Sequence, residues 1–313
     1  MVYETFLETI HTMVQNRLGN RARVSLQRVL KNNGLLLDGL TISSPASTLS
    51  PTVYLNAYYD EAEKGLPLTS ITEQILLLYE EAPIVPSELG EELRHFESVS
   101  GRIAYKLINA GDNAILLSSV PHYRYFDLAV VFYLIVSESQ EGQMTALIHH
   151  EHLKLWDITP EQLIQLAEAN TTRLLPCRIT PIEEAISQMS EWEPEVPVPF
   201  PPVNLHVLTN DKGINGASCL LYPDVLKTFS ASVDDDLIIL PSSIHEVLLT
   251  PKSKALPIDE LNEMVRTINA ADVSAEDRLS DHVYCYSREQ NCLYLPTPAT
   301  LTGSGQDGTG NPQ

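Results

Sequence analysis

Three histidines and one glutamate occupy four consecutive positions near the middle of the chain, at residues 149–152. Imidazole and carboxylate groups bind divalent metals, and imidazole also exchanges protons near neutral pH. The residues before them are apolar and β-branched enough to predict a strand that continues into the histidines. Residues two apart on a strand share a face, so His150 and His152 would lie together while His149 and Glu151 point the other way.

A carboxylate could reach this pair from the strand before it. A second apolar run precedes the histidines, and the polar stretch 137–142 between the two runs predicts a β-hairpin. In the register that this loop gives, Asp127 would oppose His152. Asp127, His150 and His152 would then form a two-histidine, one-carboxylate set, which could hold a divalent metal and serve a metal-dependent hydrolase. A register shift of one residue would separate the set.

The simpler interpretation of these residues is structural. His150 and His152 would mark the place where the strand leaves the core, and Asp127 would form a cross-strand ion pair with His152. The helical zinc motif HExxH is absent, because Lys154 stands where its second histidine would have to be.

A second group with catalytic residue types is Ser242, Ser243, His245 and Glu246. A serine nucleophile needs a base that reaches it from elsewhere and is commonly presented in the pattern GxSxG, which this segment lacks. Neighbours on one strand rarely meet in that way. We therefore interpret the segment as an exposed junction between a strand and a loop.

A cluster of positive charge stands out near the start of an otherwise acidic chain. Five basic residues follow one another with no acidic residue between them: Arg17, Arg21, Arg23, Arg28 and Lys31. They could bind phosphates or an acidic protein partner. The alternative is a solvated strand whose cations pair with the protein's own carboxylates.

The overall charge limits the classes of partner. The formal net charge is −21 and the sequence pI is about 4.7, so direct binding to free nucleic acid or to an anionic membrane is not expected. The acidic residues are spread evenly over the chain. An acidic mimic of nucleic acid would require them to gather on one face.

The cellular setting is suggested by what the chain lacks. The first 20 residues show no secretory signal pattern, and the longest apolar run, 128–136, is about half of the roughly 20 residues that span a bilayer. Four cysteines without CxxC spacing fit a reduced cytoplasm. Cys285 and Cys292 could face each other across a hairpin, although two free thiols in a sheet are the simpler interpretation.

Hydrophobic periodicity predicts an α+β protein. Residues 2–18 have helical spacing, the Asn33-Gly34 pair predicts a hairpin turn, and Thr159, Pro160 and Gln162 form a capping box at the start of a helix. Strands in hairpins with helices between them are typical of this class.

Five prolines in nine residues, from Pro194 to Pro202, cannot form a helix or a central strand. We interpret this segment as a connector between domains. The predicted organisation is an N-terminal α+β domain over 1–190, a proline-rich connector over 191–203, a C-terminal α+β domain over 204–296, and a disordered tail over 297–313.

A series of landmarks runs along almost the whole chain: "RVLKNNGLLLDGL", "PTVYLNAYY", "HLKLWDIT", "LTNDKGINGASCLLYP", "LPSSIHEV" and "LSDHVYCY". Over residues 1–290 the chain resembles DUF5688, an uncharacterised bacterial family frequent in gut Firmicutes. The resemblance implies a cytoplasmic bacterial protein. It implies no activity, cofactor or catalytic residue, because none is assigned to the family.

These observations favour a non-catalytic, cytoplasmic binding or regulatory protein that acts through a protein partner. The chain shows no cofactor-binding fingerprint. The alternatives are the metal-dependent hydrolase described above and, second, the acidic nucleic-acid mimic.

Overall fold

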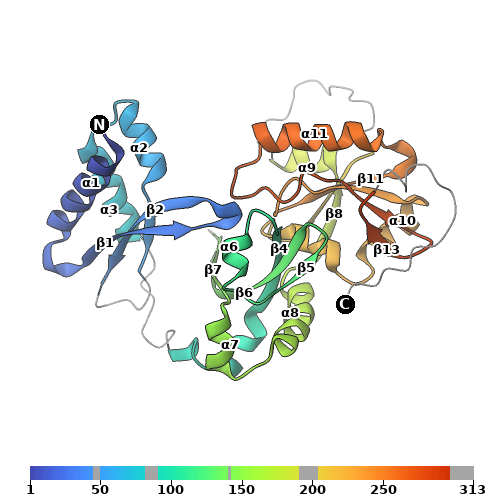
Figure 1. The fold of residues 1–313 in the computed structure, drawn as a ribbon, viewed down its shortest axis with the longest axis horizontal. Coiled ribbons are helices and arrows are strands. Elements are labelled where there is room, and N and C mark those ends of the chain that lie inside the picture. Colours follow the sequence, from blue (N-terminus) through green and yellow to red (C-terminus); the bar gives the residue numbers. More distant parts are fainter. Residues whose placement is uncertain (45–49, 82–90, 140–141, 190–203, 297–313) are drawn as a thin grey trace. The chain divides into compact units, whose positions relative to one another are not determined.

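The computed structural model describes residues 1–44, 50–81, 91–139, 142–189 and 204–296. The chain divides into two compact units. Unit 1 comprises Met1–Gly101 and Glu151–Ile158, and unit 2 comprises Arg102–His150 and Thr159–Gln313. The α+β class is confirmed, because each unit combines antiparallel sheet with helices (Figure 1).

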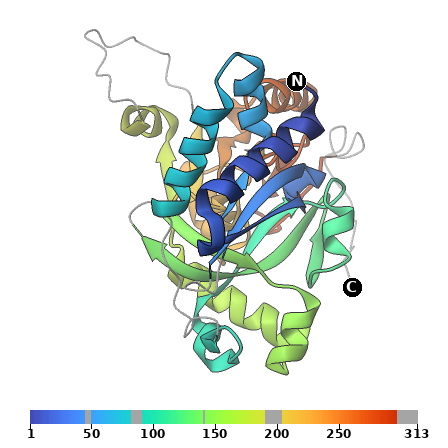
Figure 2. The same ribbon diagram turned by 90° about the vertical axis from the view of Figure 1, so that its left-hand side faces the viewer.

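Unit 1 places its main helices on one face of a three-stranded antiparallel sheet of order β1-β2-β3, as Figures 1 and 2 show. Its elements are α1 (Tyr3–Leu18), β1 (Arg23–Leu30), β2 (Leu36–Ser43), β3 (Thr52–Tyr54), α2 (Asn56–Glu63), α3 (Leu68–Glu81), α5 (Phe96–Val99) and, apart from its first residue, α7 (His150–Trp156).

The predicted periodicity explains the core of unit 1. Helix α1 buries one stripe, Phe6, Ile10, Val14 and Leu18, against a shared apolar cluster that includes Val24, Leu40 and Ile42 of the sheet and Ile71 and Ile75 of α3. The predicted hairpin is also confirmed. Asn33 and Gly34 both have positive φ, at 57° and 70°, in the turn between β1 and β2. This conformation is the one that an Asn-Gly pair favours.

Unit 2 contains two antiparallel sheets. The first consists of β4 (Ile103–Asn109), β5 (His122–Tyr125), β6 (Leu128–Ser139) and β7 (Gly142–Leu147), with β6 paired to the other three strands. Strand β6 is buried from Leu128 to Val136. Two helices accompany this sheet, α6 (Ala114–Leu117) and α8 (Pro160–Leu174).

The second sheet of unit 2 has the order β13-β12-β10-β11-β9-β8. Its strands are β8 (Cys177–Pro181), β9 (His206–Asn210), β10 (Leu237–Leu240), β11 (Val247–Pro251), β12 (Tyr284–Ser287) and β13 (Cys292–Tyr294). The helices between them are α9 (Ile182–Met189), the 3-10 helix η4 (Gly216–Leu221), α10 (Val225–Val233) and α11 (Ile258–Ala271).

The structure divides the chain at a different place from the predicted boundary at 191–203. Strand β8 precedes the proline-rich segment, yet it pairs with β9, which follows it, from Cys177 opposite Asn210 to Pro181 opposite His206. Main-chain pairing makes these strands one sheet, so unit 2 includes residues from both sides of the segment. The connector and the predicted tail, 297–313, lie outside the described residues.

After β9 the chain does not return as a strand but forms η4, whose residues are buried from Gly216 to Leu220. Cys285 opposes Tyr294, and Cys292 opposes Ser287. The two cysteines therefore do not face each other, and both are free thiols.

None of the described helices is long and apolar enough to cross a membrane.

Helix α8 is fixed to β4 by two buried side chains, the Asn170 amide, which donates to the Ile103 carbonyl at 3.1 Å, and the Thr171 hydroxyl. The capping box at Thr159 and Gln162 is confirmed, and near the other end of the helix Thr171 accepts a hydrogen bond from the Tyr105 N–H at 3.0 Å. Thr171 is fully buried, and it also donates to the Ala167 carbonyl.

Replacing Thr171 with valine should therefore destabilise the fold by about 1–3 kcal/mol, because it leaves the buried Tyr105 N–H without an acceptor at almost unchanged volume. Thr172→Val is the control, since Thr172 lies on the same helix turn but is only partly buried, and its hydroxyl donates only to carbonyls of its own helix. This change should alter stability by less than about 0.5 kcal/mol. Urea denaturation of both variants measures the difference. Equal losses would contradict the role given to Thr171.

Candidate functional site

The histidines of residues 149–152 do not lie on the predicted strand. Strand β7 ends at Leu147, and His150 is the first residue of helix α7. The hairpin itself forms, but Tyr133 opposes Leu147 where the predicted register placed Ala146, and a β-bulge follows between Ile135 and Ser137. The strand geometry proposed for Asp127, His150 and His152 is therefore wrong.

The predicted strand geometry fails because this segment forms a helix. Leu153 and Trp156 lie three residues apart on α7 and are both buried, so the segment satisfies a helical pattern after Ile148. The ring of His152 stacks on Trp156 at a centroid distance of 5.5 Å, and the Trp156 indole donates to the Leu93 carbonyl. His150 is exposed. Among the described residues, no group of three or more His, Cys, Asp or Glu side chains is placed to hold a metal ion, so the hydrolase hypothesis has no geometric support there.

Asp127 has different partners, more than 150 positions later in the chain. It follows Phe126 in the tight turn between β5 and β6, where Tyr125 pairs with Leu128. Its carboxylate accepts hydrogen bonds from the Ser280 hydroxyl, at 2.6 Å, and from the Tyr284 phenol. His282 places Nδ1 3.3 Å from the same carboxylate. We call Asp127, Ser280, His282 and Tyr284 the Asp127 cluster.

The Asp127 cluster joins the two sheets of unit 2. Asp127 belongs to the β5–β6 turn of the first sheet, and Tyr284 begins β12 of the second. Burial and the neighbouring Asp127 carboxylate raise the pKa of Tyr284 above its ordinary value, so the phenol keeps the proton that it donates. A further bond runs from the Asn109 amide, at the end of β4, to the Leu279 carbonyl at 3.0 Å.

A polar cavity of about 150 Å³ lies beside the Asp127 cluster. Its lining carries both signs of charge and consists of Asn109, Asp112, Arg266, Asn269, Ala270, Arg278, Leu279, Ser280 and Asp281. Asn269 is 2% exposed. Its amide donates to the Ser280 carbonyl and to Asp281, while its Oδ1 has no hydrogen-bond partner in the described part of the chain. The volume is about that of five water molecules.

The second catalytic-type segment forms the predicted junction between a strand and a loop, but the junction is not exposed, because Ser243 is buried and Ser242, His245 and Glu246 are partly buried. These residues do not form a triad. His245 places Nε2 3.2 Å from Asp277 Oδ1, and its Nδ1 faces the Asn215 N–H at 3.3 Å. The Ser243 hydroxyl accepts from the His245 backbone N–H. Because both ring nitrogens are engaged, the imidazole has no nitrogen left to take a proton from Ser243. Asp277, the partner that orients this histidine, was not found from the sequence, since nothing in its local pattern marks it.

The five basic residues near the start of the chain have different environments. Arg28 pairs with Asp38 at 3.1 Å, and the Lys31 ammonium lies 4.7 Å from the centre of the Tyr54 ring. Arg21 donates to the Leu18 and Arg17 carbonyls at the end of α1. The side chains of Arg17 and Arg23 are exposed. The interpretation that the cations pair with the protein's own carboxylates therefore fits Arg28.

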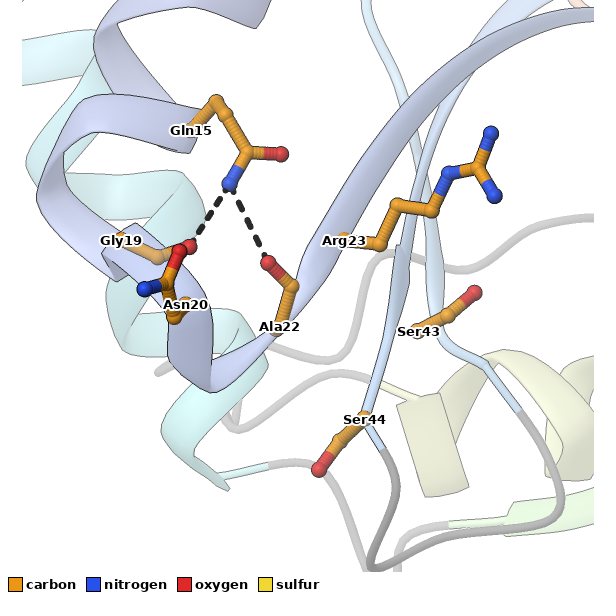
Figure 3. A pocket seen from close by; sticks show the side chains of 7 residues that line it. All are labelled: Gln15, Gly19, Asn20, Ala22, Arg23, Ser43 and Ser44. Carbon is orange, nitrogen blue, oxygen red and sulfur yellow. Dashed lines mark hydrogen bonds between the residues drawn. The ribbon is translucent and has the colours of Figure 1, made fainter.

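Arg23 also borders a wide, open cavity of about 530 Å³ in unit 1, lined by Gln15, Gly19, Asn20, Ala22, Arg23, Ser43 and Ser44. Figure 3 shows the Gln15 amide directed at the Gly19 and Ala22 carbonyls. Gln15 also accepts from the Val24 N–H with its carbonyl oxygen. Because its amide is fully used in tying α1 to β1, Gln15 is structural.

The outer edge of β1 is covered over only part of its length. At Val24 the N–H donates to Gln15 at 2.9 Å, and the carbonyl lies 3.2 Å from His11 Nε2. Alternate residues of a strand direct their backbone groups to the same edge, so Leu26, Arg28 and Leu30 direct theirs outward too. Within the described residues, no backbone hydrogen bond reaches these three from outside. Unit 1 thus presents a short, open strand edge next to exposed arginines.

Comparison with known proteins identifies a family for most of the chain. The model of a family of unknown function (DUF5688) matches residues 3–288. No curated protein and no solved structure matches the chain.

The Asp127 cluster can be tested by removing one donor. Tyr284→Phe should destabilise the fold by about 1.5–3 kcal/mol, because the phenol donates to a charged acceptor. Tyr286→Phe is the control, since Tyr286 donates to the neutral amide of Asn291 and should cost about 0.5–1.5 kcal/mol. Both changes are then repeated in an Asp127→Asn background, where the stability losses of Tyr284→Phe and Tyr286→Phe, measured by thermal denaturation, should become similar. If Tyr284→Phe still costs more than Tyr286→Phe by the same amount, the Tyr284 phenol does not act through the Asp127 carboxylate.

Proposed function

The chain belongs to the DUF5688 family of unknown function, and we propose that it is a non-catalytic binding protein that acts through a protein partner. The partner would add an extended segment to the open edge of β1. The observation that carries the proposal is this edge, where Leu26, Arg28 and Leu30 direct backbone N–H and C=O groups away from β2. Such an edge is a template for another strand.

The side chains of the hairpin support a protein partner. The distal part of β1 and β2 is rich in apolar residues, and none of them joins the core of unit 1: Leu26, Val29, Leu30, Leu35, Leu36 and Leu37. Leu36 is 53% exposed and Leu26 is 38% exposed. Figure 1 shows the end of this hairpin extending beyond the helices of unit 1. Apolar side chains beside unpaired backbone groups match a partner strand with alternate apolar residues.

The charge of the edge selects among such partners. Arg17, Arg21 and Arg23 gather where α1 ends and β1 begins. Within β1, β2 and β3, Asp38 is the single carboxylate, and it pairs with Arg28. A segment that carries carboxylates at one end would therefore find complementary charge here, whereas the net charge of −21 repels acidic proteins at longer range. We infer an apolar segment with an acidic flank.

Proline at Leu26 tests strand addition directly. Leu26→Pro removes an outward N–H, which an edge strand tolerates, while Leu26→Thr shortens the side chain and keeps the N–H. Peptides selected on the wild-type chain from a displayed library of random linear peptides should bind Leu26→Pro roughly tenfold or more weakly, since a backbone bond and close pairing are lost. Binding to Leu26→Thr should fall less.

The proposal fails if Leu26→Pro and wild type bind the selected peptides equally, or if selection enriches no sequence. Amide hydrogen exchange of the wild-type protein, with and without bound peptide, tests strand addition in a second way. Bound peptide should slow exchange at Leu26, Arg28 and Leu30 and leave the α8 amides unchanged.

Charge selection is tested separately with Arg23→Glu. The selected peptides should carry acidic residues and bind this variant roughly three- to tenfold more weakly, because one exposed attraction of about 0.2–1 kcal/mol becomes a repulsion. Lys254→Glu makes the same change of charge at an exposed position of unit 2 and should have little effect. Fluorescence anisotropy at low and high salt measures both. A similar loss in the two variants would indicate general repulsion and not a local site.

A further inference from the structure

Two cysteines far apart in the sequence meet where β8, β9 and η4 come together. Cys177 begins β8 and opposes Asn210 of β9. Cys219 lies in η4, and its thiol donates to the carbonyl of Thr209, the residue next to Asn210, at 3.3 Å. Both residues therefore lie beside neighbouring positions of β9, and each thiol shifts the pKa of the other.

The close approach of η4 to β9 depends on Gly216. A Cβ atom at this position would lie 2.1 Å from Thr209 Oγ1 and 2.4 Å from the His245 carbonyl oxygen. No real Cβ atom fits at such distances, so only glycine lets η4 lie this near. A Cβ atom at residue 216 would clash with the Thr209 hydroxyl, which donates a hydrogen bond to the His245 carbonyl at 2.8 Å. The close packing of Gly216 against Thr209 and His245 therefore sets how near η4, and with it Cys219, lies to β9.

The two thiols differ in access and in proton affinity. Cys177 is partly exposed, whereas Cys219 is fully buried. The neighbouring Cys219 thiol lowers the pKa of Cys177. The neighbouring Cys177 sulfur and burial raise the pKa of Cys219. An accessible sulfur that favours the thiolate, beside a buried one that keeps its proton, is the arrangement in which the first sulfur reacts and the second resolves.

We propose that Cys177 and Cys219 form a reversible dithiol–disulfide site that a hydroperoxide oxidises. The Cys177 thiolate attacks one peroxide oxygen, the O–O bond breaks, and hydroxide leaves. The Cys219 sulfur then attacks the sulfenic sulfur of Cys177. The S–O bond breaks, and the departing hydroxide takes the Cys219 proton as water. With hydrogen peroxide, two thiols and one peroxide yield one disulfide and two waters. A change of side-chain rotamer would bring the two sulfurs to the disulfide bond length of about 2.05 Å.

This site is separate from the strand edge proposed for partner binding, since Cys177 and Cys219 belong to unit 2 and β1 belongs to unit 1. Oxidation joins β8 to η4 and removes the hydrogen bond from Cys219 to Thr209. A reducing dithiol such as dithiothreitol would reverse the step by thiol–disulfide exchange.

Hydrogen peroxide added to the reduced full chain is the test, read by non-reducing peptide mapping with mass spectrometry. Wild type should lose two hydrogens, and the peptides that contain Cys177 and Cys219 should become linked. Cys292→Ser removes an exposed cysteine outside the pair and should form the same link. Cys219→Ser should stop at a sulfenic acid on Cys177, which dimedone traps.

The proposal is overturned if Cys177 of wild type proceeds to sulfinic acid without the link, or if links to Cys292 form first. Because a serine variant can fail to fold, alkylation of the native wild-type chain gives an independent reading. Iodoacetamide should modify Cys177 faster than the buried Cys219 and Cys285, and pretreatment with peroxide should protect Cys177. Equal rates at Cys177 and Cys285 would contradict the assignment.

Discussion

The Asp127 carboxylate is the contact on which the arrangement of unit 2 depends. It accepts from Tyr284 of the second sheet and from Ser280, and it faces His282, both of which precede β12, while its own backbone carbonyl accepts from the N–H of Ala110, directly after β4. A carboxylate partly withdrawn from water is costly unless donors replace the water. Three donors on one side chain meet that requirement only when the two sheets lie together, so the ionised carboxylate favours one mutual arrangement of the sheets.

The turn that presents Asp127 is itself under backbone strain. Phe126 has φ of 57°, a conformation that glycine adopts readily and an aromatic residue seldom does. Such a residue costs of order 1–3 kcal/mol. The Phe126 ring contacts Tyr125 and Tyr284, at centroid distances of 4.8 and 5.8 Å, and these contacts offset part of that cost. The surrounding packing therefore determines the turn conformation, and the carboxylate is held in place from both sides.

Unit 1 shows how one strand can be protected at one end and open at the other. His11 and Gln15 of α1 cover the edge of β1 at Val24, and beyond that point the helix no longer follows the strand. Open edges favour pairing between copies of a chain. The net charge of −21 opposes that pairing through repulsion between copies, while it leaves the edge available to a partner of suitable local charge.

The chain sequence determined the elements whose cause is local: the stripe of α1, the Asn33-Gly34 turn, the capping box at Thr159 and the α+β class. Each follows from spacing or from one residue's backbone preference. The tertiary structure alone decided the β6–β7 register, the helix at His150, the sheet shared across the proline-rich segment, and the partners of Asp127, His245 and Cys177. These depend on contacts between residues tens to more than a hundred positions apart, and local periodicity carries no information about which distant donor meets which acceptor.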